Sequence, residues 1–259
     1  MSAVSDLMEV RILTPEWPVP PKVRAAFTLR MGGVSAAPFD SLNVGAHVGD
    51  EAVAVAENRR RVRATLSLPE EPAWLEQVHG VEVVDLDAVT PAATPAAGMR
   101  AADAAISRRA GHVCVVQVAD CLPVLLATRD GSAIAAAHAG WRGLAAGVLE
   151  ATVKRLAVEP ADLLAWLGPA IGAAHFEVGA EVRQAFLAHD AAAAAAFAVN
   201  TRERWQCDLI SLARRRLTAL GIDAVFGGRW CTYADATRFF SYRRDGRCGR
   251  MAALIWREG

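Results

Sequence analysis

Three apolar runs follow one another between residues 114 and 137, and turn residues separate them. The runs are Cys114–Val118, Leu122–Ala127 and Ile134–Ala137, and Arg129-Asp130-Gly131 stands before the third. Short apolar runs bounded by turn residues are typical of buried strands. We therefore predict three strands here. The short turn at Gly131 favours the second and third strands as neighbours.

The period of the apolar positions changes after residue 143. From Leu144 to Leu156 they recur at helical spacing, which predicts a helix. Helical spacing or a high alanine content predicts further helices over Ala52–Leu66, Glu181–Phe197 and Asp208–Leu220. Four arginines of the first of these are expected on a solvated outer face: Arg59, Arg60, Arg61 and Arg63.

Other stretches predict the remaining organisation. Apolar or alternating runs that are typical of strands are Val23–Leu29, Val81–Leu86, Ala165–Leu167 and Met251–Trp256. Residues 28–45 predict a long loop, and long loops in compact domains are often functional. Residues 1–22 end in a proline-rich segment that cannot be helical. Pro91–Gly98 predicts a flexible connection. We expect an extension, residues 1–22, packed on a single catalytic domain, residues 23–259.

Composition excludes several classes of protein. The chain has 259 residues, 53% hydrophobic and 22% charged, which suffices for a large core and excludes a disordered or fibrous chain. One domain is the default, because α/β domains commonly reach this size. Lys plus Arg equals Asp plus Glu at 28 each, so the charge indicates no polyanion-binding surface, and we expect no nucleic-acid partner.

The chain also lacks signals for a membrane or an oxidising compartment. No stretch approaches the roughly 20 apolar residues that span a bilayer. Asp6 and Glu9 precede any apolar stretch, unlike a secretory signal, so we expect a cytoplasmic location and no membrane partner. The five cysteines are odd in number and form no CxxC pair, which favours reduced thiols.

A thiol and two imidazoles lie at the ends of predicted strands. Cys121 follows Asp120 between the first two runs, His138 closes the third run, and His79 precedes the alternating run upstream. Zinc takes histidine nitrogen and cysteine sulfur, and a catalytic zinc site keeps its fourth position for water or substrate. The spacing alone leaves two alternatives open. One is a buried inert thiol with core histidines. The other is a metal-free Cys121 nucleophile activated by His138, with Asp120 or Gln77 orienting the base.

The remaining candidates are weaker. His47, His112, His175 and His189 are interpreted as structural or exposed. Five arginines near the C-terminal end could hold an anion, with solvation as the alternative. They are Arg238, Arg243, Arg244, Arg247 and Arg250.

Several motifs together resemble the YfiH family. They are Thr28-Leu29-Arg30-Met31-Gly32-Gly33-Val34-Ser35 with Ser41-Leu42-Asn43, Gln77-Val78-His79-Gly80, Ala119-Asp120-Cys121-Leu122-Pro123 and His138-Ala139-Gly140-Trp141-Arg142-Gly143. The resemblance continues through Gly168–Gly172, Phe176–Gly179 and Asp235–Asp245, and covers about Arg24 to Trp256. Members of this family have been described as laccase-domain polyphenol oxidases, peptidoglycan editing factors and purine nucleoside phosphorylases.

The resemblance implies a fold and a metal. It implies a single α/β domain, a mixed β-sheet layered with helices, similar to the Cys-His deamidase superfamily. It also implies that His79, Cys121 and His138 bind one zinc ion, with copper as the alternative metal. Two positions depart from the family pattern: Phe176 stands where a tyrosine is expected, and Ala170 stands where a cysteine is frequent.

The resemblance further implies a zinc-dependent purine nucleoside phosphorylase, with adenosine deamination as a second activity. Adenosine, inosine or methylthioadenosine would react with phosphate to give the base and a sugar 1-phosphate. Arg30, Arg142 and Arg243 would neutralise the phosphate, and Gln77 would line the substrate site. Asn43 would contact the ribose, and Asp120 would act as a supporting residue or as acid/base. We expect a monomer or homodimer.

Three alternatives remain. The first is a Cys-His hydrolase or amidase that edits peptidoglycan precursors. The second is a copper-dependent polyphenol oxidase, although the two histidines and one cysteine lack the further ligands that a four-copper enzyme needs. The third is a metal-stabilised binding module without catalysis, for which chelation would melt the fold and no small molecule would be turned over.

Overall fold

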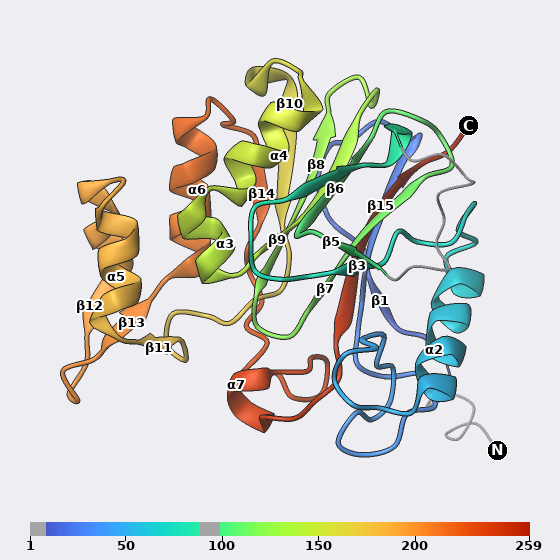
Figure 1. Cartoon of the computed structure of the whole chain (residues 1–259), viewed down its shortest axis with the longest axis horizontal. Coiled ribbons are helices and arrows are strands. Elements are labelled where there is room, and N and C mark those ends of the chain that lie inside the picture. The colour runs from blue at the N-terminus through green and yellow to red at the C-terminus, as the bar shows by residue number, and fades with distance from the viewer. Residues whose placement is uncertain (1–8, 89–98) are drawn as a thin grey trace.

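The computed structural model describes residues 9–88 and 99–259, and it confirms a single-domain mixed α/β fold (Figure 1). The larger sheet is mixed and consists, in spatial order, of β14 (Val225–Gly227), β10 (Leu163–Leu167), β8 (Leu122–Thr128), β9 (Ile134–Ala139), β6 (Ala104–Ser107) and β4 (Val83–Asp85). The second sheet is antiparallel, with the order β1 (Ile12–Leu13), β2 (Val23–Thr28), β15 (Met251–Arg257) and β7 (Val113–Val118).

Helices and two small sheets complete the described part of the chain. The helices are α2 (Ala52–Thr65), α3 (Trp141–Ala146), α4 (Val148–Leu156), α5 (Ala180–Leu187), α6 (Leu209–Ala219) and α7 (Tyr242–Asp245). Short 3-10 turns are η1 (Leu86–Ala88), η3 (Pro160–Asp162) and η4 (Ala191–Ala196). The small sheets are β11 (Glu177–Val178), β13 (Trp205–Cys207) and β12 (Phe197–Val199), and β3 (Leu75–Glu76) with β5 (Arg100–Ala101).

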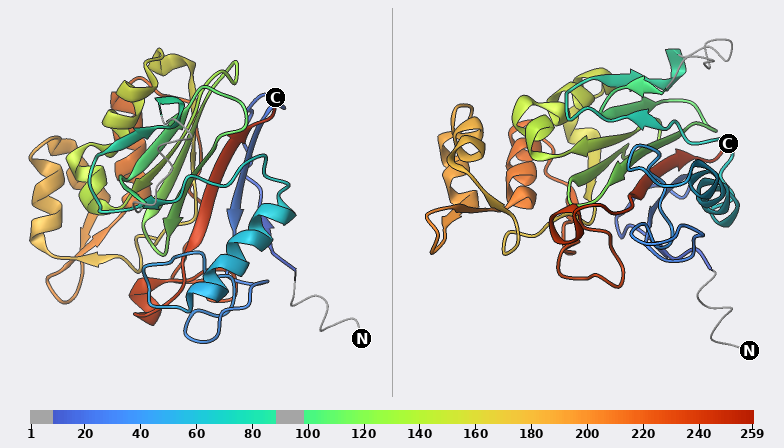
Figure 2. Two further views of the ribbon diagram at one scale, coloured as in Figure 1. Left: turned by 45° about the vertical axis from the view of Figure 1, so that its right-hand side comes forward. Right: turned by 60° about the horizontal axis from the view of Figure 1, so that its bottom comes forward.

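The two large sheets pack face to face, and helices cover their outer faces (Figure 2). In β8, Leu125 and Ala127 face the second sheet, whereas Val124 and Leu126 face α3, α4 and α6. On the far side, α2 packs through Val62 against the other face of β2, β7 and β15. Because both faces of β8 are buried, its sequence is continuously apolar and does not alternate.

The register of β8 and β9 brings the predicted thiol and imidazole to one end of the larger sheet. The two strands are antiparallel neighbours, with Leu122 opposite Ala139 and Pro123 opposite His138. Cys121 directly precedes β8, so it lies beside the end of β9. The three predicted strands and their pairing are therefore confirmed.

The predicted continuous helix over Glu181–Phe197 is wrong. Helix α5 ends at Leu187, and the alanine tract forms η4 and then enters β12. Asp190 begins η4 by accepting a hydrogen bond from the Ala192 amide, and Phe197 pairs with Cys207 of β13. Packing and strand pairing thus override the helix propensity of alanine.

The predicted solvated face of α2 is correct only in part. Arg60 and Arg63 are exposed, but the Arg59 guanidinium lies 4.0 Å from the centre of the Trp74 ring and donates to the Val44 carbonyl. Burial lowers the pKa of Arg59 to about 10, against a smaller opposing effect of the Glu71 carboxylate. Arg59 therefore connects α2 to the long loop before it.

Residues 9–22 lie against the body, where β1 pairs with β2. The division at residue 22 stays a prediction, and the predicted flexible connection Pro91–Gly98 lies outside the described residues. Within residues 9–88 and 99–259, we find no helix with the length and apolar character needed to cross a bilayer.

Candidate active site

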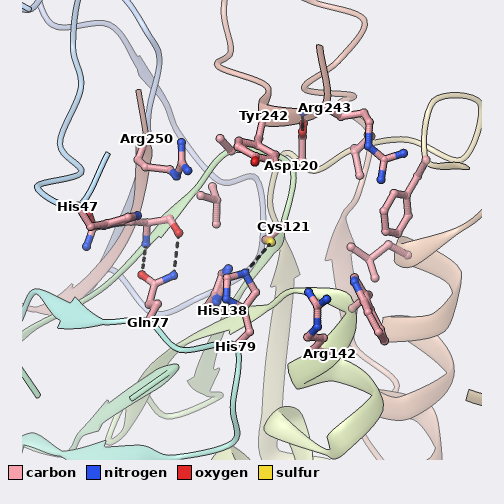
Figure 3. Close-up of a pocket in the computed structure, with 17 residues that line it drawn as sticks. His47, Gln77, His79, Asp120, Cys121, His138, Arg142, Tyr242, Arg243 and Arg250 are labelled. Carbon is pink, nitrogen blue, oxygen red and sulfur yellow. Dashed lines mark hydrogen bonds between the residues drawn. The ribbon is translucent and has the colours of Figure 1, made fainter. Parts of the chain in front are cut away.

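The side chains of His79, Cys121 and His138 meet at the end of the larger sheet (Figure 3). Their ligand atoms all lie within 4.8 Å of one another, and Cys121 Sγ is 3.8 Å from His79 Nε2. The two imidazole rings stand edge to face, with their centres 4.8 Å apart. Across residues 9–88 and 99–259, this is the one set of three or more His, Cys, Asp or Glu side chains close enough to share an ion.

Asp103 fixes the orientation of both histidines. Its carboxylate is fully buried and lies 2.8 Å from His138 Nδ1, so that ring nitrogen carries the proton and Nε2 is left for a ligand. The same carboxylate accepts the backbone amides of Val78, His79 and Gly80 at 3.2, 2.9 and 2.6 Å. These bonds hold His79 at a φ of 60°, a left-handed conformation that costs energy for a residue other than glycine.

The sequence patterns did not reveal Asp103, and the metal-free alternative named Asp120 or Gln77 as the group that orients the base. That expectation is wrong, because the carboxylate of Asp103 is the one bonded to His138. Asp103 precedes β6, which is paired with β9, and only this pairing brings it to His138. No local spacing in the sequence marks that contact.

The charges of the cluster stabilise one another. Burial acts to raise the pKa of the Cys121 thiol, but the neighbouring His138 imidazolium and hydrogen bonds from both histidines outweigh it and lower that pKa. Burial opposes a charged His138, yet Cys121 and Asp103 raise the pKa of His138. Burial also acts to raise the pKa of Asp103, and His138 with the Gly80 amide lowers it. Without a bound metal ion, the site thus favours a thiolate beside an imidazolium.

The donor set fits a single zinc or copper ion. Two imidazole nitrogens and one thiolate are ligands that both metals accept. The lowered pKa of Cys121 favours the deprotonated sulfur that metal binding requires. Asp103 supplies the outer partner that a metal-binding histidine normally has.

Asp120 supports the cluster by its hydrogen bonds. Its carboxylate accepts the Thr232 hydroxyl at 2.6 Å, the Ser241 hydroxyl at 3.0 Å and the Arg243 amide at 2.7 Å. Its φ of 87° is again left-handed. Because the Asp120 carboxylate is buried and already accepts three hydrogen bonds, the geometry favours a supporting role for Asp120 over an acid/base role. The same bonds connect the turn that carries Cys121 to α7.

A cavity of about 500 Å³ opens over the cluster, a size that suits a small molecule. Its lining combines the cluster with three arginines, Arg142, Arg243 and Arg250, and with aromatic rings. The Arg142 guanidinium lies 4.5 Å from the centre of the Trp141 ring, and that of Arg243 lies 5.3 Å from the Phe176 ring. Asp120 is the acidic side chain of this lining, so the cavity is cationic.

Two predicted substrate-binding residues, Arg30 and Asn43, do not line this cavity. The Arg30 guanidinium is occupied by the carbonyls of Asp40 and Ala236 and does not line the cavity. Asn43 is fully buried, donates to Asp50 and accepts the amides of Gly45 and Arg250. Both side chains stabilise the loop at residues 29–51.

Gln77, in contrast, lines the cavity beside the metal cluster. Its amide exchanges two hydrogen bonds with the backbone of Gln117, at 2.8 Å to the carbonyl and 2.7 Å from the amide. These two bonds satisfy the Gln117 backbone as a neighbouring strand would, near the end of β7. They fix the Gln77 side chain at the cavity wall.

Three more residues line the cavity: His47, interpreted from the sequence as structural or exposed, Tyr242, which was not singled out, and Arg250, one of the five arginines considered for anion binding. Burial, followed by the charges of Arg250 and Arg59, lowers the pKa of His47. His47 lies in a loop far from the other site residues in sequence, and no periodicity marks it. Of the two family departures, Phe176 is buried and lines the cavity, whereas Ala170 forms a strand bridge with Cys231.

Comparison with known proteins agrees with this architecture. Residues 24–258 match the family described as multi-copper polyphenol oxidoreductase laccase. A Neisseria meningitidis protein of the DUF152 family, solved by crystallography, superposes with a TM-score of 0.89 and is 45% identical; the match covers 96% of this chain and 99% of that chain.

Named relatives match over nearly their whole length. The Shigella flexneri protein named purine nucleoside phosphorylase YfiH is 52% identical, over 95% of this chain and 98% of its own. A Pseudomonas aeruginosa protein, also named purine nucleoside phosphorylase, is 55% identical, over 94% of this chain and 97% of its own.

Proposed function

The chain belongs to the laccase-domain family, which includes the YfiH proteins, and we propose that it is a purine nucleoside phosphorylase that works with one bound metal ion. The observation that carries the proposal is the cationic, aromatic cavity directly over His79, Cys121 and His138. The names of relatives that share half of the sequence support it. The substrates proposed are adenosine, inosine or methylthioadenosine together with inorganic phosphate.

Phosphorolysis requires two ligands close together in one cavity. A phosphate oxygen forms a bond to C1′ of the sugar while the glycosidic C–N bond breaks, and the bonding electron pair leaves with the purine. Phosphate is an acceptor for guanidinium donors, and Arg142 and Arg243 both line the cavity. The rings of Trp141 and Phe176 offer apolar surface for the flat base. These residues would hold both reactants near the reacting carbon.

The metal proposed is zinc, held by His79 Nε2, Cys121 Sγ and His138 Nε2. When bound, it supplies a Lewis acid that stabilises developing negative charge on an oxygen. Asp103 keeps the proton of His138 on Nδ1, and the backbone bonds from Asp103 keep the His79 ring in place. Copper stays the alternative metal.

The test is product analysis by mass spectrometry. Zinc-loaded protein is incubated with adenosine in the presence and absence of phosphate, beside a Cys121→Ala variant. We expect adenine and ribose 1-phosphate to form only with phosphate and only in the unsubstituted protein. If the zinc-loaded protein cleaves none of adenosine, inosine and methylthioadenosine, the proposed activity is refuted. Inosine formed from adenosine without phosphate would reveal deamination, which stays a prediction.

A second function is favoured by one specific observation. Asp103, His138 and Cys121 form a chain in which a carboxylate orients an imidazole beside a thiol of lowered pKa. This is the arrangement of a cysteine nucleophile with its base. The alternative is therefore a hydrolase or amidase acting on a peptidoglycan precursor. It predicts that metal-stripped protein releases an amino acid from such precursors, with Cys121 trapped as the acyl-enzyme.

A further inference from the structure

Side chains that can donate hydrogen bonds to an anion lie on two sides of the metal-ligand cluster. In Figure 3, Arg142 and Arg243 lie on one side of Cys121, and His47 and Arg250 lie on the other. The proposed reaction uses one free phosphate ion, for which the Arg142–Arg243 end suffices. The His47–Arg250 end is therefore unexplained by that reaction.

The second end carries donors that no protein group uses. The Arg250 guanidinium donates from Nη1 to the carbonyls of Cys248 and Gly249, at 2.9 and 3.1 Å. Within the described residues, the Arg250 Nε and Nη2 groups and the His47 ring make no hydrogen bond, and the guanidinium lies 5.9 Å from the centre of the Tyr242 ring. Asp120, the carboxylate of the cavity lining, is occupied by Thr232, Ser241 and the Arg243 amide. An adjacent Nε and Nη2 pair matches two oxygens of a phosphoryl group.

The second end is also rigidly built. Asn43 Oδ1 accepts the Gly45 amide at 2.9 Å and the Arg250 amide at 2.8 Å, which joins the loop of His47 to the segment of Arg250. The Gly45 backbone packs so closely on the Arg250 side chain that a Cβ atom there would lie 2.7 Å from its Cγ. Asn43 is therefore a positioning residue for this end. Donors fixed in advance bind an anion without losing conformational freedom.

We propose that His47 and Arg250 form a phosphoryl-binding end of the cavity, separate from the Arg142–Arg243 end, and that the site binds purine nucleoside 5′-phosphates. The inference rests on the proposed function. With inorganic phosphate at one end, a phosphoryl group that occupies the other end at the same time must be carried by the nucleoside.

Isothermal titration calorimetry with adenosine and adenosine 5′-monophosphate tests the inference. The zinc-loaded protein is titrated without free phosphate, beside Arg250→Gln, Arg142→Gln and the matched control Arg247→Gln. Arg247 is a neighbour that donates to the Gly49 carbonyl and does not line the cavity. We expect the nucleotide to bind at least about tenfold more tightly than the nucleoside. Arg250→Gln should abolish this preference without changing adenosine affinity, and the other two variants should keep it.

Titration with inorganic phosphate alone separates the two sources of the phosphoryl group. We expect Arg142→Gln to weaken phosphate binding and Arg250→Gln to leave it unchanged. Three results would overturn the inference: no preference for the nucleotide, a preference that survives in Arg250→Gln, or an equal loss of phosphate binding in Arg250→Gln. The phosphorolysis assay on the same preparation distinguishes these results from failure of the proposed function, which loss of adenosine cleavage alone would indicate.

Discussion

Asp103 is the residue that holds both histidines of the candidate metal site. It holds His138 by its side chain and His79 by the backbone, from a fully buried position. We expect Asp103→Asn to lower zinc affinity about 10- to 100-fold, because the amide cannot replace a charged partner of the imidazole. Competition with a chromophoric chelator measures this affinity.

The matched control is Asp87→Asn. Asp87 also contacts a histidine, His112, at 3.2 Å, but that pair does not belong to the metal cluster. Zinc affinity should stay unchanged in this variant. Equal losses in both variants would show that the effect arises from general destabilisation and would contradict the role given to Asp103.

Four cysteine thiols have a shifted pKa. Among them, we expect Cys121 to react fastest once the metal has been removed. His138 and the hydrogen bonds of the cluster lower its pKa, whereas burial raises the pKa of Cys114, Cys207 and Cys248. The thiolate is the form that reacts, so modification by iodoacetamide at pH 7 should be fastest at Cys121 and should slow as the pH falls. Peptide mapping by mass spectrometry measures the rates.

The His138→Gln variant is the control for that experiment. Without the imidazolium, the pKa of Cys121 should move up toward or above the ordinary thiol value of about 8.5, and the rate at pH 7 should fall at least about tenfold. An unchanged rate would show that His138 does not stabilise the thiolate.

The sequence could predict the residues of the candidate metal site but not the residues that support them. His79, Cys121 and His138 stand at strand ends within distinctive motifs, so both their chemistry and the family resemblance pointed to them. Asp103 reaches the cluster through the pairing of β6 with β9, and Arg250, one of the five arginines considered for an anion, is positioned by Asn43. Such long-range contacts leave no periodic trace in one sequence. Arg30 is the opposite case. It belongs to a motif that suggested substrate binding, but its guanidinium binds backbone carbonyls and stabilises a loop.

At the scale of elements, the turn between β9 and α3 must approach the metal cluster closely. A Cβ atom at Gly140 would lie 2.9 Å from Cys121 Sγ and 3.2 Å from His79 Cδ2. The φ of Gly140 is −59°, which alanine tolerates, so the cost falls on the cluster and not on the backbone. We expect Gly140→Ala to fold and to lose at least about tenfold in zinc affinity, as a chelator competition would measure.

Gly80→Ala provides the comparison for Gly140→Ala. Gly80 follows His79, but the nearest atoms to a Cβ there lie 3.5 and 3.6 Å away, which is ordinary contact. This variant should bind zinc as the unsubstituted protein does. Normal zinc affinity in Gly140→Ala would mean that the β9–α3 turn moves freely and would contradict the close approach.

Elements with a strong apolar pattern were predictable, and those fixed by packing were not. The runs that became β7, β8 and β9 are bounded by turns and buried on both faces. The alanine-rich tract had high helix propensity but no apolar stripe. The residue that follows it, Phe197, pairs with Cys207 in a sheet and so does not continue a helix. Local propensity was therefore a weak guide where tertiary contacts decide.

At the scale of the whole molecule, the interface between the two large sheets holds the site in place. Leu125 of β8 is fully buried in this interface. We expect Leu125→Ala to lower the free energy of unfolding by about 2–5 kcal/mol, because it removes buried surface and leaves a cavity. Urea unfolding followed by circular dichroism measures the change.

Leu125→Met is the matched volume-conserving variant. It should cost less than about 1.5 kcal/mol. Zinc affinity should change little in either variant, since Leu125 does not line the ligand cavity. A loss below about 1 kcal/mol in Leu125→Ala would mean that the sheets do not pack tightly. The resemblance implied one mixed sheet with helices, and only the structure divides the strands into two stacked sheets.

We propose that phosphorolysis takes place in the cavity over one metal ion. The most direct measurement is a titration of metal-stripped protein with zinc while phosphate-dependent release of adenine from adenosine is followed. We predict that activity rises linearly and reaches its plateau at one zinc per chain. Full activity in the stripped protein, or a plateau that requires several metal ions per chain, would contradict the account.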